Sequence, residues 1–328
     1  MVATLFGLAF AVVATVCACT ETVDEDELSL EADMLRASAQ VGACVTPPAG
    51  MVLWHSYDET SGPTALDHSF GAGAAHGVHV NVTPGLAGQV ALALGFNGAT
   101  SGIRVPDDPV LDFGEHSFAV DFWIYPAVGE QQAVILSKGT QGGSHWTMLQ
   151  GLQITWDGAF LNVTLANNGN SSIAFTNGPG LIVPGQWNFV AINVDRDQEM
   201  AQTFVNGVDN GMFPLPDPGS ISTSADLLIG DRGTLAFTWT LDGRLDEFEI
   251  FKRTLTVAEI GALYSAGPDG KCKSCPPASS VINYSSTDPQ ACAQVDTPVV
   301  DCEPSEGWHR FDNNCGCGCI KVAGDGMQ

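Results

Sequence analysis

The sequence predicts an all-β protein: an antiparallel β-sandwich of the jelly-roll type, followed by a small disulfide-rich C-terminal module. Three observations lead to this prediction. Many short segments alternate apolar and polar residues with period two, as strands with one buried face do. Turn signals such as Asp157-Gly158 and Asn206-Gly207 separate these segments. Charged residues make up only 15% of the chain while glycine numbers 37, a balance typical of short strands joined by many turns.

The first strand of the sandwich is expected at residues 51–57, before the turn-rich segment 58–63. Two hairpins are expected at Asp157-Gly158 and Asn206-Gly207, because both dipeptides tolerate the positive φ angles of a type I′ turn. The segments 154–156 and 159–163 flank the first dipeptide, and 203–205 and Val208 flank the second. Further strands are expected at 91–96, 102–105, 117–125, 133–138, 186–194 and 227–230.

The last strand of the sandwich is expected at residues 243–251. On a regular strand, Phe248 and Ile250 fall on one face, and Glu247 and Glu249 fall on the other. The segment therefore predicts a strand with one face in the core.

Asp246 has the same parity as the apolar face of this strand, which is an unusual place for a carboxylate. The apolar residues that follow the strand recur at a spacing that suits a short helix. They are Leu255, Ala258, Ile260, Leu263 and Tyr264. We expect this helix to close the sandwich.

The chain is strongly acidic. Lys plus Arg numbers 12 against 37 Asp plus Glu, which gives a net charge of −25 over 328 residues. Such a surface repels nucleic acid and anionic lipid, and it favours cations, calcium among them, and neutral ligands. The alternative interpretation is that the charge serves solubility in a salty or extracellular setting.

Residues 1–19 are predicted to be an export signal. The apolar run from Leu5 to Ala18 is too short to span a bilayer and has the length of a signal core. The segment Val16-Cys17-Ala18-Cys19 is similar to the lipobox of bacterial lipoproteins, which implies that Cys19 carries a lipid anchor. Ordinary secretion with cleavage nearby is the alternative.

Residues 20–43 are rich in Asp and Glu and lack aromatic residues, so they are predicted to be a disordered acidic spacer.

A series of short motifs occurs in a particular order along the chain. The motifs are Trp54 with 58–62, then 91–98, 118–124, 135–139, 185–190, 204–207, 228–230 and 245–251. This ordered set resembles the LamG-like jelly-roll domain, the bacterial branch of the concanavalin A-like lectin/glucanase fold. The resemblance covers roughly residues 45–267, and it places the domain at 44–272. It implies a binding or adhesion module and does not specify the ligand.

The resemblance also implies a structural calcium site. In jelly rolls of this kind the first and last strands often lie side by side, which would bring Asp58 and Asp246 together, with Asp67 as a further ligand. Calcium prefers several oxygen ligands of this type. The alternative is that Asp246 accepts hydrogen bonds from loop amides.

No catalytic site is predicted. Glu247 and Glu249 lie on one face of a strand, as the paired carboxylates of some glycan hydrolases do. Their pattern departs from the Glu-x-Asp-x-x-Glu signature of those hydrolases, and Arg244 stands where an acid is needed. We therefore predict that the protein is not an enzyme, with a divergent glycan hydrolase as the least favoured alternative.

Sugar binding is predicted to use exposed aromatic side chains, which stack on pyranose rings. Trp146, Trp239 and His145 lie in Gly/Ser/Thr-rich stretches that resemble loops, so they are the candidate ligand-binding residues. Packing in the core or at an edge is the alternative for both tryptophans.

Cys44 and Cys272 flank the predicted jelly roll. LamG-like domains of bacterial secreted proteins often have such a pair, so the resemblance implies a Cys44–Cys272 disulfide.

Residues 273–328 are predicted to form a small module with three disulfides, whose pairing the sequence leaves open. Its cysteines are Cys275, Cys292, Cys302, Cys315, Cys317 and Cys319. A zinc site that includes Cys272 and Cys275 is the alternative, which export to an oxidising compartment disfavours.

These observations together predict a secreted or outer-surface lipid-anchored bacterial protein. Its expected role is non-catalytic binding of a carbohydrate or a surface protein, supported by calcium. The alternative is a structural envelope or adhesion protein without a small ligand. No nucleic-acid partner is expected, and membrane contact is expected only through the lipid anchor.

Overall fold

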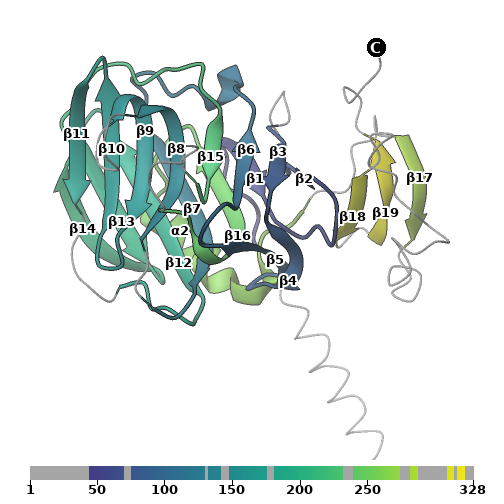
Figure 1. The fold of residues 1–328 in the computed structure, drawn as a ribbon. Helices are drawn as coiled ribbons and strands as arrows, with labels where there is room; N and C mark the ends of the chain where they lie inside the picture. The colour runs from purple at the N-terminus through teal and green to yellow at the C-terminus, as the bar shows by residue number, and fades with distance from the viewer. Residues whose placement is uncertain are drawn as a thin grey trace, which may run out of the picture. The chain divides into compact units, whose positions relative to one another are not determined.

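A computed structural model describes six segments of the chain: residues 44–69, 75–129, 132–141, 148–175, 181–231 and 239–273, with side chains except at 141 and 175. It also describes the backbone of 281–286, 309–313 and 316–321. Figure 1 shows two β-sheets packed face to face with one α-helix, as the sequence predicts.

The first sheet has the strand order β14-β13-β12-β7-β16-β5-β4, and β1 also pairs with β16. Its strands are β1 (Met51–His55), β4 (Thr83–Ala87), β5 (Leu92–Asn97), β7 (Phe118–Pro126), β12 (Asn188–Asp195), β13 (Met200–Val205), β14 (Val208–Pro214) and β16 (Asp242–Phe251). Strand β16, the last strand of this sheet along the chain, thus lies inside the sheet. It pairs with β7 along one edge, and with β5 and then β1 along the other edge.

The second sheet has the order β11-β10-β9-β8-β15-β6-β3-β2. Its strands are β2 (Thr64–Ala65), β3 (Gly77–Val80), β6 (Gly102–Val105), β8 (Ala133–Gln141), β9 (Met148–Trp156), β10 (Leu161–Asn167), β11 (Asn170–Phe175) and β15 (Leu227–Ile229). All described strand pairs in both sheets are antiparallel, which confirms the predicted fold class.

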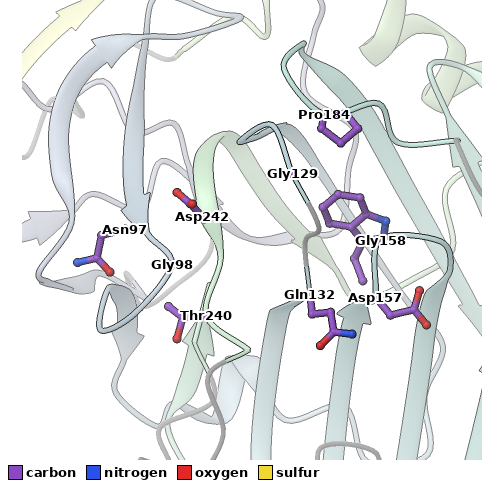
Figure 2. Close-up of a pocket in the computed structure, with 10 residues that line it drawn as sticks. Asn97, Gly98, Gly129, Gln132, Asp157, Gly158, Pro184, Thr240 and Asp242 are labelled. Atoms are coloured by element: carbon purple, nitrogen blue, oxygen red, sulfur yellow. The ribbon is translucent and has the colours of Figure 1, made fainter.

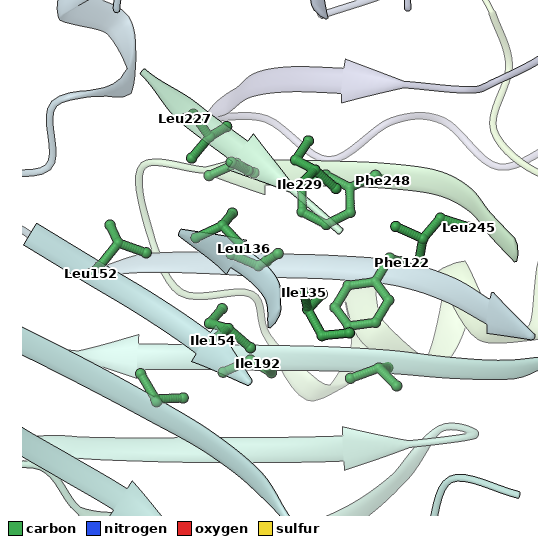
Figure 3. Packing of buried hydrophobic residues seen from close by; sticks show 14 of the residues in the cluster. Phe122, Ile135, Leu136, Leu152, Ile154, Ile192, Leu227, Ile229, Leu245 and Phe248 are labelled. Atoms are coloured by element: carbon green, nitrogen blue, oxygen red, sulfur yellow. The ribbon is translucent and has the colours of Figure 1, made fainter. Parts of the chain in front are cut away.

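The main hydrophobic core lies between the two sheets (Figure 3). Phe122 of β7 and Phe248 of β16 stack with ring centroids 5.6 Å apart. The second sheet contributes Ile135, Ile154 and Ile229 to the same cluster, all fully buried. The period-two apolar pattern of these strands is therefore the pattern of their inward faces.

A second core covers the opposite face of the first sheet, where helix α2 (Val257–Ala266) packs. Ile260 and Leu263 of the helix belong to the same buried cluster as Trp54 and Trp123. A capping box at Thr256 begins the helix. Two short 3-10 helices, η1 (Pro109–Leu111) and η2 (Gly267–Asp269), are the other helical segments among the described residues.

Both predicted hairpins form, but only the one at Asn206-Gly207 has the predicted type I′ turn; at Asp157-Gly158 the loop has four residues, Asp157 lacks the positive φ angle, and β10 begins at Leu161. Val205 pairs with Val208, and the turn residues Asn206 and Gly207 have φ angles of 51° and 74°, as a type I′ turn requires. The strands β9 and β10 pair around the loop 157–160. The turn signals thus set the register of these strands.

Strand β16 contains a β-bulge that the sequence pattern does not reveal. Its register against β7 shifts between Asp246 and Glu249, and Glu247 has a φ of 49°. The extra residue places Asp246 on the same face as Glu249 and opposite to Phe248. The parity expected for Asp246 was therefore wrong, because it assumed a regular strand.

The predicted Cys44–Cys272 disulfide is present, with a Cα–Cα distance of 4.8 Å. Residues 270–273, which we call the strap, lie alongside Val45. The Val45 amide donates to the Gly270 carbonyl, and the Cys272 amide donates to the Val45 carbonyl, both at 2.9 Å. The two ends of the domain are thus joined by backbone hydrogen bonds as well as by the disulfide.

The C-terminal module contains a three-stranded sheet in the order β17-β19-β18. Its strands are β17 (Val281–Ser286), β18 (His309–Asn313) and β19 (Gly316–Lys321). Cys317 and Cys319 belong to β19. The other four cysteines of the module lie outside the described residues, and its disulfides stay predictions.

The signal, the lipid on Cys19 and the acidic spacer concern residues 1–43, which lie outside the described residues. In the part of the chain that is described, no helix has the length and apolarity needed to cross a membrane.

Candidate functional site

Loop residues of both sheets line a groove of about 700 Å³ at one end of the sandwich. Figure 2 shows Asn97 and Asp242 on one side of it and Asp157 and Pro184 on the other. The lining residues are Asn97, Gly98, Gly129, Gln132, Trp156, Asp157, Gly158, Pro184, Thr240 and Asp242. They come together because antiparallel strands bring the ends of β5 and β7 next to the start of β16.

Tight turns fix several of the lining residues. The Oδ1 atom of Asn97 accepts hydrogen bonds from the amides of residues 99–101 at 2.9 to 3.2 Å. The Oδ1 atom of Asp157 accepts from the amides of residues 159–160 at 2.9 and 2.7 Å. These Asx-type turns hold the groove walls in one conformation.

Gly98 is needed for the shape of this groove. Its φ is 68°, and a Cβ atom added there would lie 2.9 Å from the Asp242 Cβ atom. A larger residue would therefore push Asp242 away or distort the turn.

The groove is polar and acidic. Its two carboxylates are Asp157 and Asp242, and none of the ten lining residues is a lysine, arginine or histidine. The side chains of Gln132 and Asp242 are exposed and can present an amide and a carboxylate to a ligand. Trp156, which is only 2% exposed, supplies an apolar wall.

Two half-buried aromatic residues lie near the groove in sequence. Trp187 follows Pro184 by three residues, and its ring lies 5.6 Å from that of Tyr125 in an edge-on arrangement. Arg244, two residues beyond Asp242 on β16, stacks 5.2 Å above the Tyr125 ring. Neither aromatic ring is among the residues that line the groove, and the Arg244 guanidinium lies over the Tyr125 ring.

The structure does not place the predicted ligand-binding residues in this groove. Trp239 is half-buried, and its carbonyl accepts a hydrogen bond from the Val134 amide at 2.9 Å. Only its neighbour Thr240 lines the groove. Trp146 and His145 lie outside the described residues.

The predicted calcium ligands do not form one cluster. No group of three or more histidine, cysteine, aspartate or glutamate side chains that could hold a metal ion occurs in the described segments. Asp67 accepts hydrogen bonds from the amides of Trp54, Ser69 and Ala75 at 2.8 to 2.9 Å. It is therefore occupied by protein donors.

Asp58 and Asp246 also have protein partners. Asp58 accepts from the Leu92 amide at 3.0 Å and forms an ion pair with Lys273. The Oδ2 atom of Asp246 accepts from the Val90 amide at 2.7 Å, while its buried Oδ1 atom has no partner among the described residues. Loop amides thus occupy part of Asp246, as the alternative interpretation expected, and calcium binding stays a prediction.

The two glutamates of β16 are buried beneath the strap. Lys271 Nζ lies 2.6 Å from Glu247 Oε2 and 2.5 Å from Glu249 Oε1. Trp54 Nε1 donates to Glu247 at 3.0 Å, and the Lys271 ammonium lies 5.0 Å from the centre of that indole ring. Neither glutamate lines the groove. They form an internal charged cluster and do not face a glycan.

Burial controls the protonation of this cluster. Desolvation raises the pKa of Glu247 to about 7, although Lys271 opposes the shift. Desolvation and the neighbouring Asp121 raise the pKa of Glu249 further above its usual range. Burial alone would lower the pKa of Lys271, but the attraction of Glu247 and Glu249 outweighs it and raises the pKa.

Comparisons with known proteins agree with this architecture. A family model described as the concanavalin A-like lectin/glucanases superfamily matches residues 97–261. No match was found among curated proteins. Among solved structures, this chain is similar to a botulinum neurotoxin serotype D/C binding domain, with 15% identity and a TM-score of 0.49. The match covers 66% of this chain and 52% of that one.

Two further solved structures have a TM-score of 0.50 and 15% identity to this chain. They are mutants of HCR D/C and of HCR/D, and the matches cover 66% of this chain and 52% and 51% of those chains. This chain thus spans about half the length of the structures it matches, and the similarity shows the fold alone. The family model covers just over half of the 328 residues, and the chain belongs to the concanavalin A-like lectin/glucanase superfamily.

Proposed function

We propose that this protein is a non-catalytic module that binds carbohydrate in the groove at the end of its sandwich. The observation that carries the proposal is the groove itself, whose volume of about 700 Å³ is within the usual range of small-ligand sites. Sugar hydroxyls form hydrogen bonds with the kinds of group that Gln132 and Asp242 offer. Trp156 adds an apolar wall, as carbohydrate sites require.

The acidic lining favours an uncharged sugar. A sulfated or sialylated sugar would meet Asp157 and Asp242 without a lining cation, in a protein of net charge −25. Like charges within a few ångströms repel even in water. We therefore expect neutral glycans to bind and anionic ones to be excluded.

The groove chemistry favours binding over hydrolysis. Glycan hydrolysis uses two carboxyl groups that flank the scissile bond. Of the two lining carboxylates, Asp157 is held by turn amides, and the buried pair on β16 lies under the strap. A structural envelope or adhesion role without a small ligand is the second candidate.

An exported setting accompanies this proposal. The Cys44–Cys272 disulfide supports an oxidising compartment, because disulfides persist mainly outside the cytosol. The lipid anchor on Cys19 and the bacterial surface location are proposed on the sequence of residues 1–19 alone.

A glycan array tests the proposal with the wild-type protein, Asp242→Ala and the control Asp197→Ala. Asp197 is exposed in the turn between β12 and β13, away from the lining residues. Losing a hydrogen bond to a charged group should weaken neutral-glycan binding by about tenfold or more in Asp242→Ala. The control should bind as the wild type does.

Failure of the wild-type protein to bind any glycan would favour the structural role. Equal binding by wild type and Asp242→Ala would remove the groove as the site.

A further inference from the structure

We propose that the side chains of Lys271 and Glu249 condense into an intramolecular amide bond, which links the strap covalently to β16. The bond joins Lys271 Nζ to the Glu249 carboxyl carbon. It makes this buried cluster a self-modification site and does not depend on the glycan-binding proposal.

The reacting atoms are already in contact. Lys271 Nζ lies 2.5 Å from Glu249 Oε1, a separation at which the nitrogen also approaches the carboxyl carbon. Glu249 is fully buried, and Lys271 is 7% exposed. An amine and a carboxyl group held this way form a near-attack arrangement in which bulk water has little access.

The cluster holds more carboxyl groups than its lysine can neutralise. Asp121 of β7 lies directly opposite Glu249 of β16, and both side chains are buried. Two neighbouring buried carboxyl groups repel each other when both are ionised, so one of them holds a proton. Burial and the charge of Asp121 accordingly raise the pKa of Glu249. A carboxylic acid therefore lies beside the amine, and this neutral form is the one that an amine attacks.

The fold holds Lys271 in place from three sides. Its neighbour Cys272 is bonded to Cys44, and the strap backbone pairs with Val45. The Trp54 ring lies beneath the ammonium, 5.0 Å from Nζ to the ring centroid. The geometry thus fixes the nucleophile against a single face of β16.

The reaction balances without any co-reactant. The Lys271 ammonium first gives a proton to the Glu247 carboxylate, 2.6 Å away, which frees the amine. The amine attacks the Glu249 carboxyl carbon and forms an N–C bond. Asp121, the ionised member of the carboxyl pair, then accepts the second proton from the nitrogen and passes it to the departing hydroxyl. The C–O bond breaks, and one water molecule leaves.

Two physical effects favour the product. Condensation replaces a buried ammonium and carboxyl group by a neutral amide, which removes the desolvation cost of the buried charge. The fixed geometry gives the amine an effective molarity on the order of 10⁵ M or more relative to free reactants. An uncharged, enclosed cluster also retains less water for the reverse hydrolysis.

Peptide mapping of the full-length protein tests the bond. After denaturation, reduction, alkylation and trypsin digestion, an unlinked chain gives the linear peptides 245–252 and 254–271. A linked chain gives one branched peptide of 245–252 and 254–273, because trypsin cannot cleave after an acylated Lys271. The branched peptide is lighter by one water molecule than its two parts, and its fragment ions identify the glutamate.

The control variants are Lys271→Arg and Lys273→Arg. Lys271→Arg keeps the positive charge but cannot form this amide, and it should lose the branched peptide. Lys273→Arg leaves the reacting pair unchanged and should keep it. Linear peptides alone from the wild-type protein would overturn the proposal, as would a branch at Glu247 or at Asp121, which lies in peptide 105–138. The wild-type map decides the question even if a variant fails to fold.

Discussion

Glu59 is a side chain whose protonation depends directly on folding. Its Oε1 atom accepts a hydrogen bond from the Leu66 amide at 2.7 Å, and its buried Oε2 atom has no partner among the described residues. Burial raises the pKa of Glu59 to about 7. The folded protein therefore prefers the neutral acid over a pH range in which the unfolded chain is already ionised.

This preference makes stability depend on pH. Below the unfolded pKa of 4.5 the side chain is protonated in both states, and above about 7 the folded state holds an unfavourable charge. The contribution of Glu59 should therefore fall as pH rises from 4.5 to 7, by at most about 3 kcal/mol. In Glu59→Gln this part of the decline should disappear.

Urea unfolding of wild type and Glu59→Gln at several pH values measures the difference. Comparing the two proteins is necessary because burial lowers the pKa of His55 to about 4, which makes stability change in the opposite direction below pH 6.5. Parallel pH profiles of the two proteins would contradict the prediction.

At the residue scale the sequence predicted the Cys44–Cys272 disulfide, but it did not predict which face of β16 carries Asp246 or which residues line the groove. Cys44–Cys272 followed from the family resemblance. The position of Asp246 depends on the bulge at Glu247, a non-glycine residue with positive φ that alternation cannot reveal. The groove was missed because its residues come from five separate loops. Only Asp157-Gly158 gave a signal, as a turn.

Helix α2 gives a prediction at the scale of one element. The Thr256 hydroxyl accepts a hydrogen bond from the Glu259 amide at 3.2 Å, and the Glu259 carboxylate accepts one from the Thr256 amide at 2.8 Å. Arg253 also pairs with Glu259, and this hydrogen bond lowers the pKa of Glu259 to about 2. The start of the helix is therefore fixed by side chains.

Thr256→Ala should lower the free energy of unfolding by about 1 kcal/mol, because it removes the N-cap. Thr256→Ser keeps the hydroxyl and is the matched control. Denaturant unfolding measures both. If alanine and serine give the same stability, the cap does not contribute.

The strands that the sequence predicted best are those with a regular run of buried residues, such as β7 and β12. The strands that the sequence analysis missed include β3 and β4. They lie toward the edges of their sheets, and their residues are mostly exposed or half-buried, without a run of buried apolar side chains. β4 also contains a proline and a glycine, which disfavour strands locally. Pairing with a formed sheet, rather than local sequence, determines these elements.

For the whole molecule, the Cys44–Cys272 disulfide closes a loop with a sequence separation of 228 residues. In the chain-entropy model, a loop of this length stabilises the folded state by up to about 5 kcal/mol. Replacing both cysteines by serine should therefore lower the free energy of unfolding by several kcal/mol. Chemical denaturation of the double variant measures the loss, and unchanged stability would show that backbone pairing alone holds the two ends.

The central place of β16 also bears on how the chain reaches its native state. Its residues 242–251 are made late, yet they separate β7 from β5 and β1 in the finished sheet. Such pairings between distant segments form slowly, and an incomplete sheet exposes open edges. About three quarters of the polypeptide must therefore be synthesised before the first sheet can be completed. This delay keeps the nascent chain without a finished sheet for longer, a property that would suit the export proposed above.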